Sequence, residues 1–426
     1  MVDMFRACLL LSLAFATAAV LPAQVTYSKE ISRILQAKCQ QCHRDGDIAP
    51  FALDSYDAVL RWASSIQNAL ATRVMPPWKP KDGFGDFRDS FQLTEDERSM
   101  ILAWLASGMA EGDPADLPDP IKIQGEWPLG EPDVTLAMSA PYTPPVGADM
   151  YRCFVIPTGI ADGGYLSAID VLPGARQVVH HVLMFQDNSG AGVDLDGKDG
   201  APGYPCFGGP GFSIGLNNLN AAMGGWAPGQ RTHFLPDGIG IQLQKATNII
   251  IQVHYHPTSA TAQDRTRIGL YFSKVPVQQR LFMVPIVNDT FKIPAGEEKY
   301  EVNASFTVLP FLAAKAIWVY PHMHLLGRDI KMDLLNSDQS VTPLIWEDNW
   351  DFNWQGSYTY KDQIAIPSGS TVRLRCTYDN SSNNLKNPNY PPVAVTWGEQ
   401  TTDEMCVGFL GVTLDFEKYL PLQPAR

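Results

Sequence analysis

Histidine and positive charge are scarce in this sequence, and no long hydrophobic run follows its first residues. The 426-residue chain has 8 histidines and a net charge of −13, with 45 acidic against 32 basic residues. This acidic balance argues against a nucleic-acid partner. Beyond the N-terminal segment no stretch reaches about 18 uncharged apolar residues, so we expect no membrane span. Ser/His/Asp arrangements and Gly-rich phosphate loops in a suitable context are also missing.

The beginning of the chain predicts export. Arg6 precedes an apolar run from Ala7 to Val20, and small residues lead up to Ala23. This order is typical of a secretory signal peptide, which we predict to be residues 1–23. We therefore expect a secreted or periplasmic protein.

Hydrophobic spacing predicts helices in the first part of the mature chain. Apolar residues recur at helical spacing in three stretches: 31–35, 59–66 and 100–105. Thr94 and Glu97 fit a capping box at the start of the last helix, and Gly108 fits its stop. The Pro-rich residues 113–128 that follow have the composition of a linker.

After the linker the pattern changes from helices to strands. Apolar or alternating runs of about four to eight residues, separated by Gly, Pro and Asn, predict an all-β structure. Clear examples are residues 248–255, 314–320 and 371–377. We expect a multidomain protein, with a small all-α domain at 24–112 followed by two all-β sandwich or jelly-roll domains at 129–274 and 275–426.

The sequence Cys39-Gln40-Gln41-Cys42-His43 fits covalent attachment of one haem c. Its two thiols can form thioether bonds to the haem vinyl groups, and its imidazole can bind the iron. A redox Cys-x-x-Cys followed by a chance histidine is the alternative. No thioredoxin-like βαβ pattern surrounds the motif, which favours haem.

Met75 is the predicted sixth ligand of the haem iron. It precedes Pro76 in a rigid stretch that does not have a helical pattern. The domain resembles a small class I cytochrome c, in which the axial methionine commonly stands before a proline. Met100 and Met109 are rivals, but Met100 lies on the apolar face of the last predicted helix and fits the core better.

Most of the remaining histidines are paired. The pairs are His180 with His181, His254 with His256, and His322 with His324. Two histidines at i and i+2 on a strand point to the same side, as a shared copper, zinc or nickel ion requires. Adjacent histidines point to opposite faces of a regular strand, so His180 and His181 can share an ion only at a bulge or a strand end. A lone histidine would usually be a core residue, but three pairs favour metal binding.

Four stretches, in this order, resemble the copper type II, ascorbate-dependent monooxygenases, which include peptidylglycine α-hydroxylating and dopamine β-monooxygenase. The stretches are 180–185, 252–255, 322–327 and 403–406, and the resemblance covers about residues 130 to 420. It implies that His180, His181 and His254 hold one copper ion, which is used for electron transfer.

The resemblance assigns His322, His324 and Met405 to a second copper ion, where oxygen binds and the substrate C–H bond is broken. The chemistry agrees, since a thioether is a soft ligand that favours Cu(I). The resemblance thus implies two copper ions in all. It gives no role to His256, and the isolated His233 is expected to be structural.

The cysteines predict disulfide bonds. Apart from Cys8 and the two cysteines of the haem motif, four remain in a chain that we expect to be exported, which suggests two disulfides. The family pairs the cysteine at Cys406 with one resembling Cys376. The resemblance then implies Cys153 with Cys206 as the second pair.

Three positions depart from the peptide-amidating members of the family. Tyr320 stands where those enzymes have the arginine that holds the peptide carboxylate, and Val407 and Phe409 replace their asparagine and tyrosine. A peptide with a C-terminal glycine is therefore not the expected substrate. A less charged or aromatic small organic molecule is favoured.

Together these features predict a monooxygenase that uses O2 to hydroxylate a C–H bond, with its own haem c passing electrons to the copper at His180, His181 and His254. The external one-electron donor would be ascorbate or a redox protein. A non-catalytic haem and copper carrier, or a copper-handling protein, is the alternative, and an oxidase-like use of oxygen is a second one. The complete second site with Met405 favours the monooxygenase, because a carrier would not need it.

Overall fold

The computed structural model describes residues 24–45, 49–121, 126–147, 149–206, 209–214, 218, 220–228, 230, 232–255, 262–398, 400–419 and 422. The predicted signal peptide and His256 lie outside the described residues. None of the helices in the described ranges is long and apolar enough to cross a membrane.

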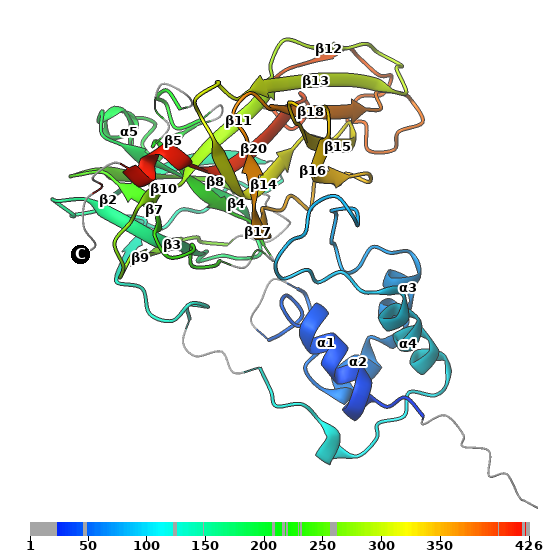
Figure 1. Cartoon of the computed structure of the whole chain (residues 1–426). Helices are drawn as coiled ribbons and strands as arrows, with labels where there is room; N and C mark the ends of the chain where they lie inside the picture. The colour runs from blue at the N-terminus through cyan, green and yellow to red at the C-terminus, as the bar shows by residue number, and fades with distance from the viewer. Residues whose placement is uncertain are drawn as a thin grey trace, which may run out of the picture.

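The N-terminal part of the chain is helical (Figure 1). It contains the π-helical turn η1 (Tyr27–Ile31), α1 (Ser32–Lys38), α2 (Tyr56–Arg61), α3 (Ala63–Ala71), α4 (Glu95–Ala106) and the 3-10 turn η2 (Pro114–Asp116). The predicted capping box is confirmed: the Thr94 hydroxyl accepts from the Glu97 backbone N–H, and the Glu97 carboxylate accepts from the Thr94 backbone N–H. Ile31, Leu35 and Trp104 are buried in the small core that these helices share.

The next part of the chain forms a first β unit. Its strands are β1 (Val134–Ala137), β2 (Met150–Pro157), β3 (Gly164–Leu172), β4 (Val179–Asp187), β5 (Tyr204–Pro205), β6 (Ala222–Trp226), β7 (Ile239–Leu243), β8 (Asn248–Tyr255), β9 (Arg267–Phe272) and β10 (Gln279–Arg280), with the helix α5 (Ala191–Leu195) between β4 and β5. They build two sheets, ordered β5-β2-β8-β4-β6 and β1-β9-β3-β7-β10. Side chains such as Val182 and Val253 from one sheet and Leu166 and Leu270 from the other form one buried core.

The C-terminal part forms a second β unit. Its strands are β11 (Phe282–Asn288), β12 (Lys292–Ile293), β13 (Tyr300–Thr307), β14 (Ala314–His322), β15 (Gly327–Leu335), β16 (Val341–Glu347), β17 (Tyr358–Ile366), β18 (Thr371–Tyr378), β19 (Val395–Thr396) and β20 (Cys406–Leu414), followed by the 3-10 turn η3 (Asp415–Tyr419). The four-stranded sheets β11-β20-β14-β17 and β13-β18-β15-β16 enclose its core, and β12 pairs with β19.

The two units confirm the prediction of β-sandwich domains. In each, alternating residues of two sheets meet in one core, as two packed sheets require. Both disulfides are present, Cys153 with Cys206 and Cys376 with Cys406, and the second joins β18 to the first residue of β20.

Residues 78–91, here called the docking segment, join the helical part to the second β unit. Phe87 forms an antiparallel bridge with Tyr360 on the edge strand β17. The backbone N–H of Arg88 donates to the carbonyl of Thr359 at 2.8 Å. Phe87 is only 5% exposed, because it packs into the core of the second unit. The docking segment thus covers an unpaired sheet edge.

Aromatic and charged contacts extend this junction. The ring of Trp78 lies 5.2 Å from the ring of Tyr358 in an edge-on contact. The backbone N–H of Lys81 donates to the carbonyl of Trp346 at 2.8 Å, and its ammonium lies 4.1 Å from the centre of the Trp346 indole. The helical part is therefore held by packing as well as by the linker.

Candidate metal centres

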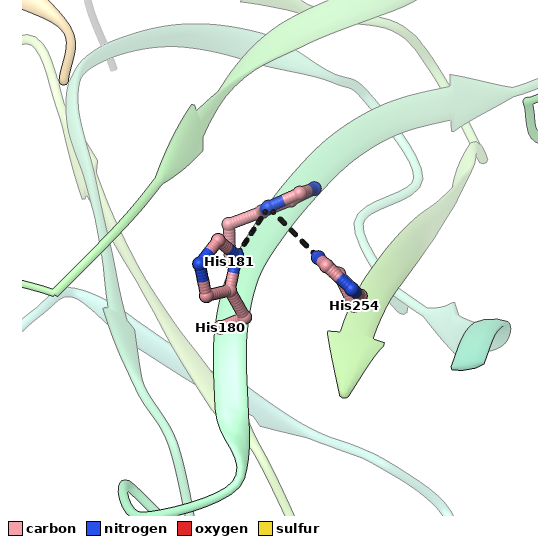
Figure 2. A group of neighbouring side chains, drawn as sticks. All are labelled: His180, His181 and His254. Atoms are coloured by element: carbon pink, nitrogen blue, oxygen red, sulfur yellow. Dashed lines mark hydrogen bonds between the residues drawn. The ribbon is translucent and has the colours of Figure 1, made fainter. Parts of the chain in front are cut away.

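Three histidines of the first β unit meet at one point. His181 on β4 stands opposite His254 on β8 in the strand register. Figure 2 shows His180 and His254 on either side of His181, whose Nδ1 lies 3.3 Å from Nδ1 of His180 and 3.4 Å from Nδ1 of His254. One ring nitrogen from each residue lies within 4.8 Å of the others, a spacing that can hold a metal ion.

A β-bulge brings the two adjacent histidines together. The register between β4 and β8 shifts between Val179 and His181. An extra residue at a bulge turns a side chain that would otherwise point to the opposite face of the sheet. The structure therefore has the irregularity that a shared ion at His180 and His181 requires.

The environment of this first histidine group keeps the imidazole of His181 neutral. His181 is 7% exposed and His254 is fully buried, and Tyr151 stacks on His254 with ring centres 4.2 Å apart. Burial, and then the neighbouring His254 and His180, lowers the pKa of His181 well below its usual value. A neutral imidazole offers the lone pair that a metal ion needs. Asp149 lies 3.7 Å from Nε2 of His254.

His322 and His324 form a second group at the end of β14. Nδ1 of His322 lies 2.6 Å from Oε1 of Gln355, and Nδ1 of His324 lies 3.1 Å from the carbonyl of Asp403. Because both partners are oxygen acceptors, each Nδ1 carries the proton and each Nε2 keeps its lone pair. Such bonds fix the orientation of a ligand ring.

Both imidazoles of the second group are also held neutral. Burial is the main cause, and it lowers the pKa of His322 to about 3 and that of His324 to about 4. Their rings lie 5.1 Å apart and nearly perpendicular.

Glu404 connects Met405 to the second histidine group. Its buried carboxylate accepts backbone N–H bonds from His324 at 2.9 Å, Leu326 at 2.5 Å and Met405 at 3.2 Å. The Tyr378 hydroxyl donates to the Met405 carbonyl at 2.7 Å. Both segments that carry the predicted ligands are thus tied to one carboxylate, so their relative position is fixed.

The two histidine groups face each other across one phenyl ring. Phe352 lies 5.9 Å from His180 in a stacked contact and 6.0 Å from His324 in an edge-on contact. No sequence pattern pointed to Phe352, Gln355 or Glu404 as part of the site. They follow no metal-ligand motif, and the only signal that could have found Glu404 is its place next to Met405.

The N-terminal motif lies at the end of α1. Neither Cys39 nor Cys42 forms a disulfide bond, and Nδ1 of His43 lies 3.1 Å from the carbonyl of Phe51. The His43 Nδ1 therefore carries the proton, and its Nε2 keeps the lone pair that an iron ligand requires. Burial lowers the pKa of His43, which keeps the ring neutral.

The three candidate methionines differ in their surroundings. Met100 and Met109 pack against the core of the helical part, whereas Met75 follows α3 in a half-buried loop. Met100 and Met109 thus have a packing role in the core, which leaves Met75 as the candidate iron ligand. The pairing of Met75 with His43 stays a prediction.

His233 joins two parts of the chain. Its Nε2 contacts a carboxylate oxygen of Asp89 in the docking segment, while His233 itself belongs to the first β unit.

Comparison with known proteins identifies related sequences for the β units. Residues 281–412 match the family described as copper type II ascorbate-dependent monooxygenase, C-terminal domain. MOXD1 homolog 1 of Drosophila melanogaster is 22% identical over 253 residues, which cover 55% of this chain and 35% of that protein. DBH-like monooxygenase protein 1 of Gallus gallus is 23% identical, covering 55% of this chain and 39% of that protein, and the Homo sapiens protein of the same name is 21% identical with 56% and 39% covered.

The chain spans 35% to 39% of the length of these relatives. Among solved structures, PNGF-II matches with 9% identity and a TM-score of 0.28, covering 66% of this chain and 65% of that chain. A match with such a low TM-score establishes neither a shared fold nor a shared function.

Proposed function

We propose that the chain is a copper type II ascorbate-dependent monooxygenase that hydroxylates a C–H bond of a small organic substrate, because residues 281–412 match the C-terminal domain of that family. The reaction consumes O2, two electrons and two protons, and yields the alcohol and water. Copper at the two histidine groups would supply the one-electron steps, and a haem c at the N-terminal motif would supply the electrons. The disulfides and the relatives are compatible with a secreted protein, and we propose export to the periplasm.

The observation that carries this proposal is the pair of histidine groups on either side of Phe352. The first group, His180, His181 and His254, is built on two strands and closely packed. The second, His322 and His324, is linked through Glu404 to Met405. A site of three histidines and a site of two histidines with a methionine suit different tasks. The methionine thioether favours Cu(I), the copper state that reacts with oxygen.

The residues of the chain do the positioning in this proposal. The Gln355 side-chain oxygen and the Asp403 carbonyl accept hydrogen bonds from Nδ1 of His322 and His324, which would leave both Nε2 lone pairs to hold a copper ion. The buried Phe352 ring between the groups would limit the water there, which would protect a reactive site from side reactions.

A cavity of about 100 Å³ supports an internal electron donor. It is lined by Gln41, which stands between the two cysteines of the haem motif, and by His180 and His181 of the first histidine group. The predicted haem attachment site and the predicted electron-transfer copper therefore border the same space. Two cysteines outside any disulfide bond and the Nε2 lone pair of His43 fit a covalently attached haem.

Metal content of the copper-loaded, haem-matured protein tests the proposal. We expect one iron and two coppers per chain, and one copper fewer in a variant that combines His322→Ala with Met405→Ala. The variant His254→Ala serves as the matched control, because it should lose the other copper and keep the second site. One copper or none in the unmodified protein would contradict the two-copper mechanism.

Oxygen consumption separates the enzyme from the carrier. A monooxygenase couples oxygen uptake to a hydroxylated product, and the coupling should disappear when His322 and Met405 are replaced. Copper-dependent oxidation of the haem without any product would instead support the electron carrier.

A further inference from the structure

A cavity of about 190 Å³ lies between the two β units and borders the first histidine group. His181 of the first histidine group lines it, and so does Tyr320, whose ring lies 6.2 Å from that of His322. Its walls are mostly hydrophobic and include Leu183, Trp226, Met283, Trp318 and Phe409. A mostly apolar cavity that borders one predicted metal ligand and a neighbour of another is the expected place for a substrate.

Flat aromatic surfaces shape the wall on the side of the second β unit. The ring of Tyr320 stacks on Phe409 with centres 5.9 Å apart. The indole of Trp318 lies so close over Gly411 that a side chain at that glycine would overlap it. A β-bulge between Ala316 and Trp318 sets the indole in this place. The wall therefore offers ring faces to a substrate, and such faces stack with other rings.

Charge at the cavity has one sign. Among the described residues that line it there is no carboxylate, whereas Arg88 of the docking segment and Lys361 of β17 both line it. Lys361 is paired with Asp86 at 2.6 Å, outside the lining. The exposed Arg88 guanidinium donates to the Lys361 carbonyl at 3.3 Å. An ammonium group in this cavity would meet cations and find no carboxylate in the described lining.

We propose that the cavity binds an apolar, ring-bearing substrate whose polar end is neutral or anionic, and that Arg88 excludes amines. This inference rests on the proposed monooxygenase function and names its substrate class. Tyr320 stacks on the ring, and the polar end points toward Arg88. The helical part of the chain thereby contributes a specificity residue to a site built by the β units.

Calorimetric titration of the haem-containing, copper-loaded full chain tests the proposal without turnover. Titrations under anaerobic conditions and without reductant would use 3-phenylpropanoate, 3-phenylpropan-1-ol and 3-phenylpropan-1-amine, which differ only at the polar end. We expect the acid and the alcohol to bind at least about fivefold more tightly than the amine. Propanoate and propylamine serve as controls for direct binding to copper, and both should bind more weakly than their ring-bearing partners.

Charge reversal at Arg88 tests the residue itself. Arg88→Glu should reduce the affinity for the acid about threefold or more, raise that for the amine, and leave the alcohol unchanged. Because Arg88 pairs with Thr359 through its backbone, the docking should persist. Arg61→Glu, an exposed arginine on α2, is the matched control and should change none of the three affinities.

Some results would overturn the proposal. An amine that binds as tightly as the acid and the alcohol, ring-bearing ligands that bind no better than the controls, or affinities that Arg88→Glu leaves unchanged would each do so. Since binding needs neither oxygen nor electrons, ligands that bind as expected but are never hydroxylated would count against the proposed function alone.

Discussion

The residues that hold the predicted metal ligands in place are as important for the site as the ligands themselves. Gln355 is 6% exposed, and its Oε1 accepts hydrogen bonds from His322 Nδ1 at 2.6 Å and from the Tyr320 hydroxyl at 3.3 Å. A hydrogen-bonded ligand ring has a fixed tautomer and direction, which is why such partners affect metal affinity.

Gln355→Leu keeps the size of the side chain and removes the acceptor. We expect copper affinity at the second site to fall about 10- to 100-fold, because His322 loses the bond that orients it. Competition with a copper chelator measures the effect. The affinity of the first histidine group is the internal control and should stay the same, and an unchanged second site would show that Gln355 does not position His322.

Glu347 gives a prediction about pH. It is fully buried at the end of β16, and burial raises its pKa to about 8, against the opposing effects of Tyr358 and Lys79. Between about pH 4.5 and 8 the unfolded chain therefore carries the ionised form while the folded chain keeps the proton. The contribution to stability is fully present below about pH 4.5 and is lost as the pH rises through 8.

Glu347→Gln removes this titration while keeping a neutral side chain of similar shape. The difference in unfolding free energy between the variant and the unmodified protein should grow in favour of the variant by up to about 1.4 kcal/mol per pH unit between pH 5 and 8. Urea unfolding at several pH values measures it. The exposed Glu297→Gln is the matched control, and pH profiles that run parallel for Glu347→Gln would contradict the prediction.

At the scale of elements, regular periodicity predicted the segments in which it was clearest. The runs predicted at residues 248–255, 314–320 and 371–377 lie in β8, β14 and β18, and the capping box begins α4. Hydrophobic alternation and capping act within one segment, so the sequence displays them directly. The docking segment had no such pattern, because its order comes from residues far along the chain, such as Tyr360 and Trp346.

Phe87→Ala should weaken the docking. Phe87 is 5% exposed in the core of the second β unit, and truncation of a buried phenylalanine typically costs about 3 to 5 kcal/mol. Chemical denaturation and the rate of proteolysis within residues 78–91 measure the loss. Phe311→Ala changes a side chain that is 76% exposed, so it should alter neither. Equal behaviour of the two variants would mean that the docking segment does not depend on Phe87.

At the scale of the whole molecule, the docking segment fixes the position of the helical part relative to the first histidine group. A linker alone would let the two parts meet by diffusion, whereas bridges to β17 and β16 hold Gln41 at the cavity that also contains His180 and His181. A haem held in a fixed position would lose no translational or rotational entropy before each electron transfer. We therefore expect electron transfer within the chain at a rate that does not depend on protein concentration.

Removal of copper tests this connection in the intact protein. If the first histidine group receives electrons from the haem, chelation of copper should leave the reduced haem stable in oxygen, and restored copper should return rapid oxidation. Stopped-flow absorbance of the haem band follows both states. Equally fast oxidation with and without copper would show that the haem reacts with oxygen by itself.

The sequence by itself determined which residue types could bind metal or haem in this protein, and the secondary structure of its most regular segments. Clustered histidines, the Cys-x-x-Cys-His motif and Met405 are local patterns, and a metal ligand must be one of a few residue types whatever the fold. Only the tertiary structure decided which groups meet. Phe352 lies between two histidine groups, and Arg88 borders a cavity made by distant strands, because these contacts depend on the packing of separate sheets and carry no local signal.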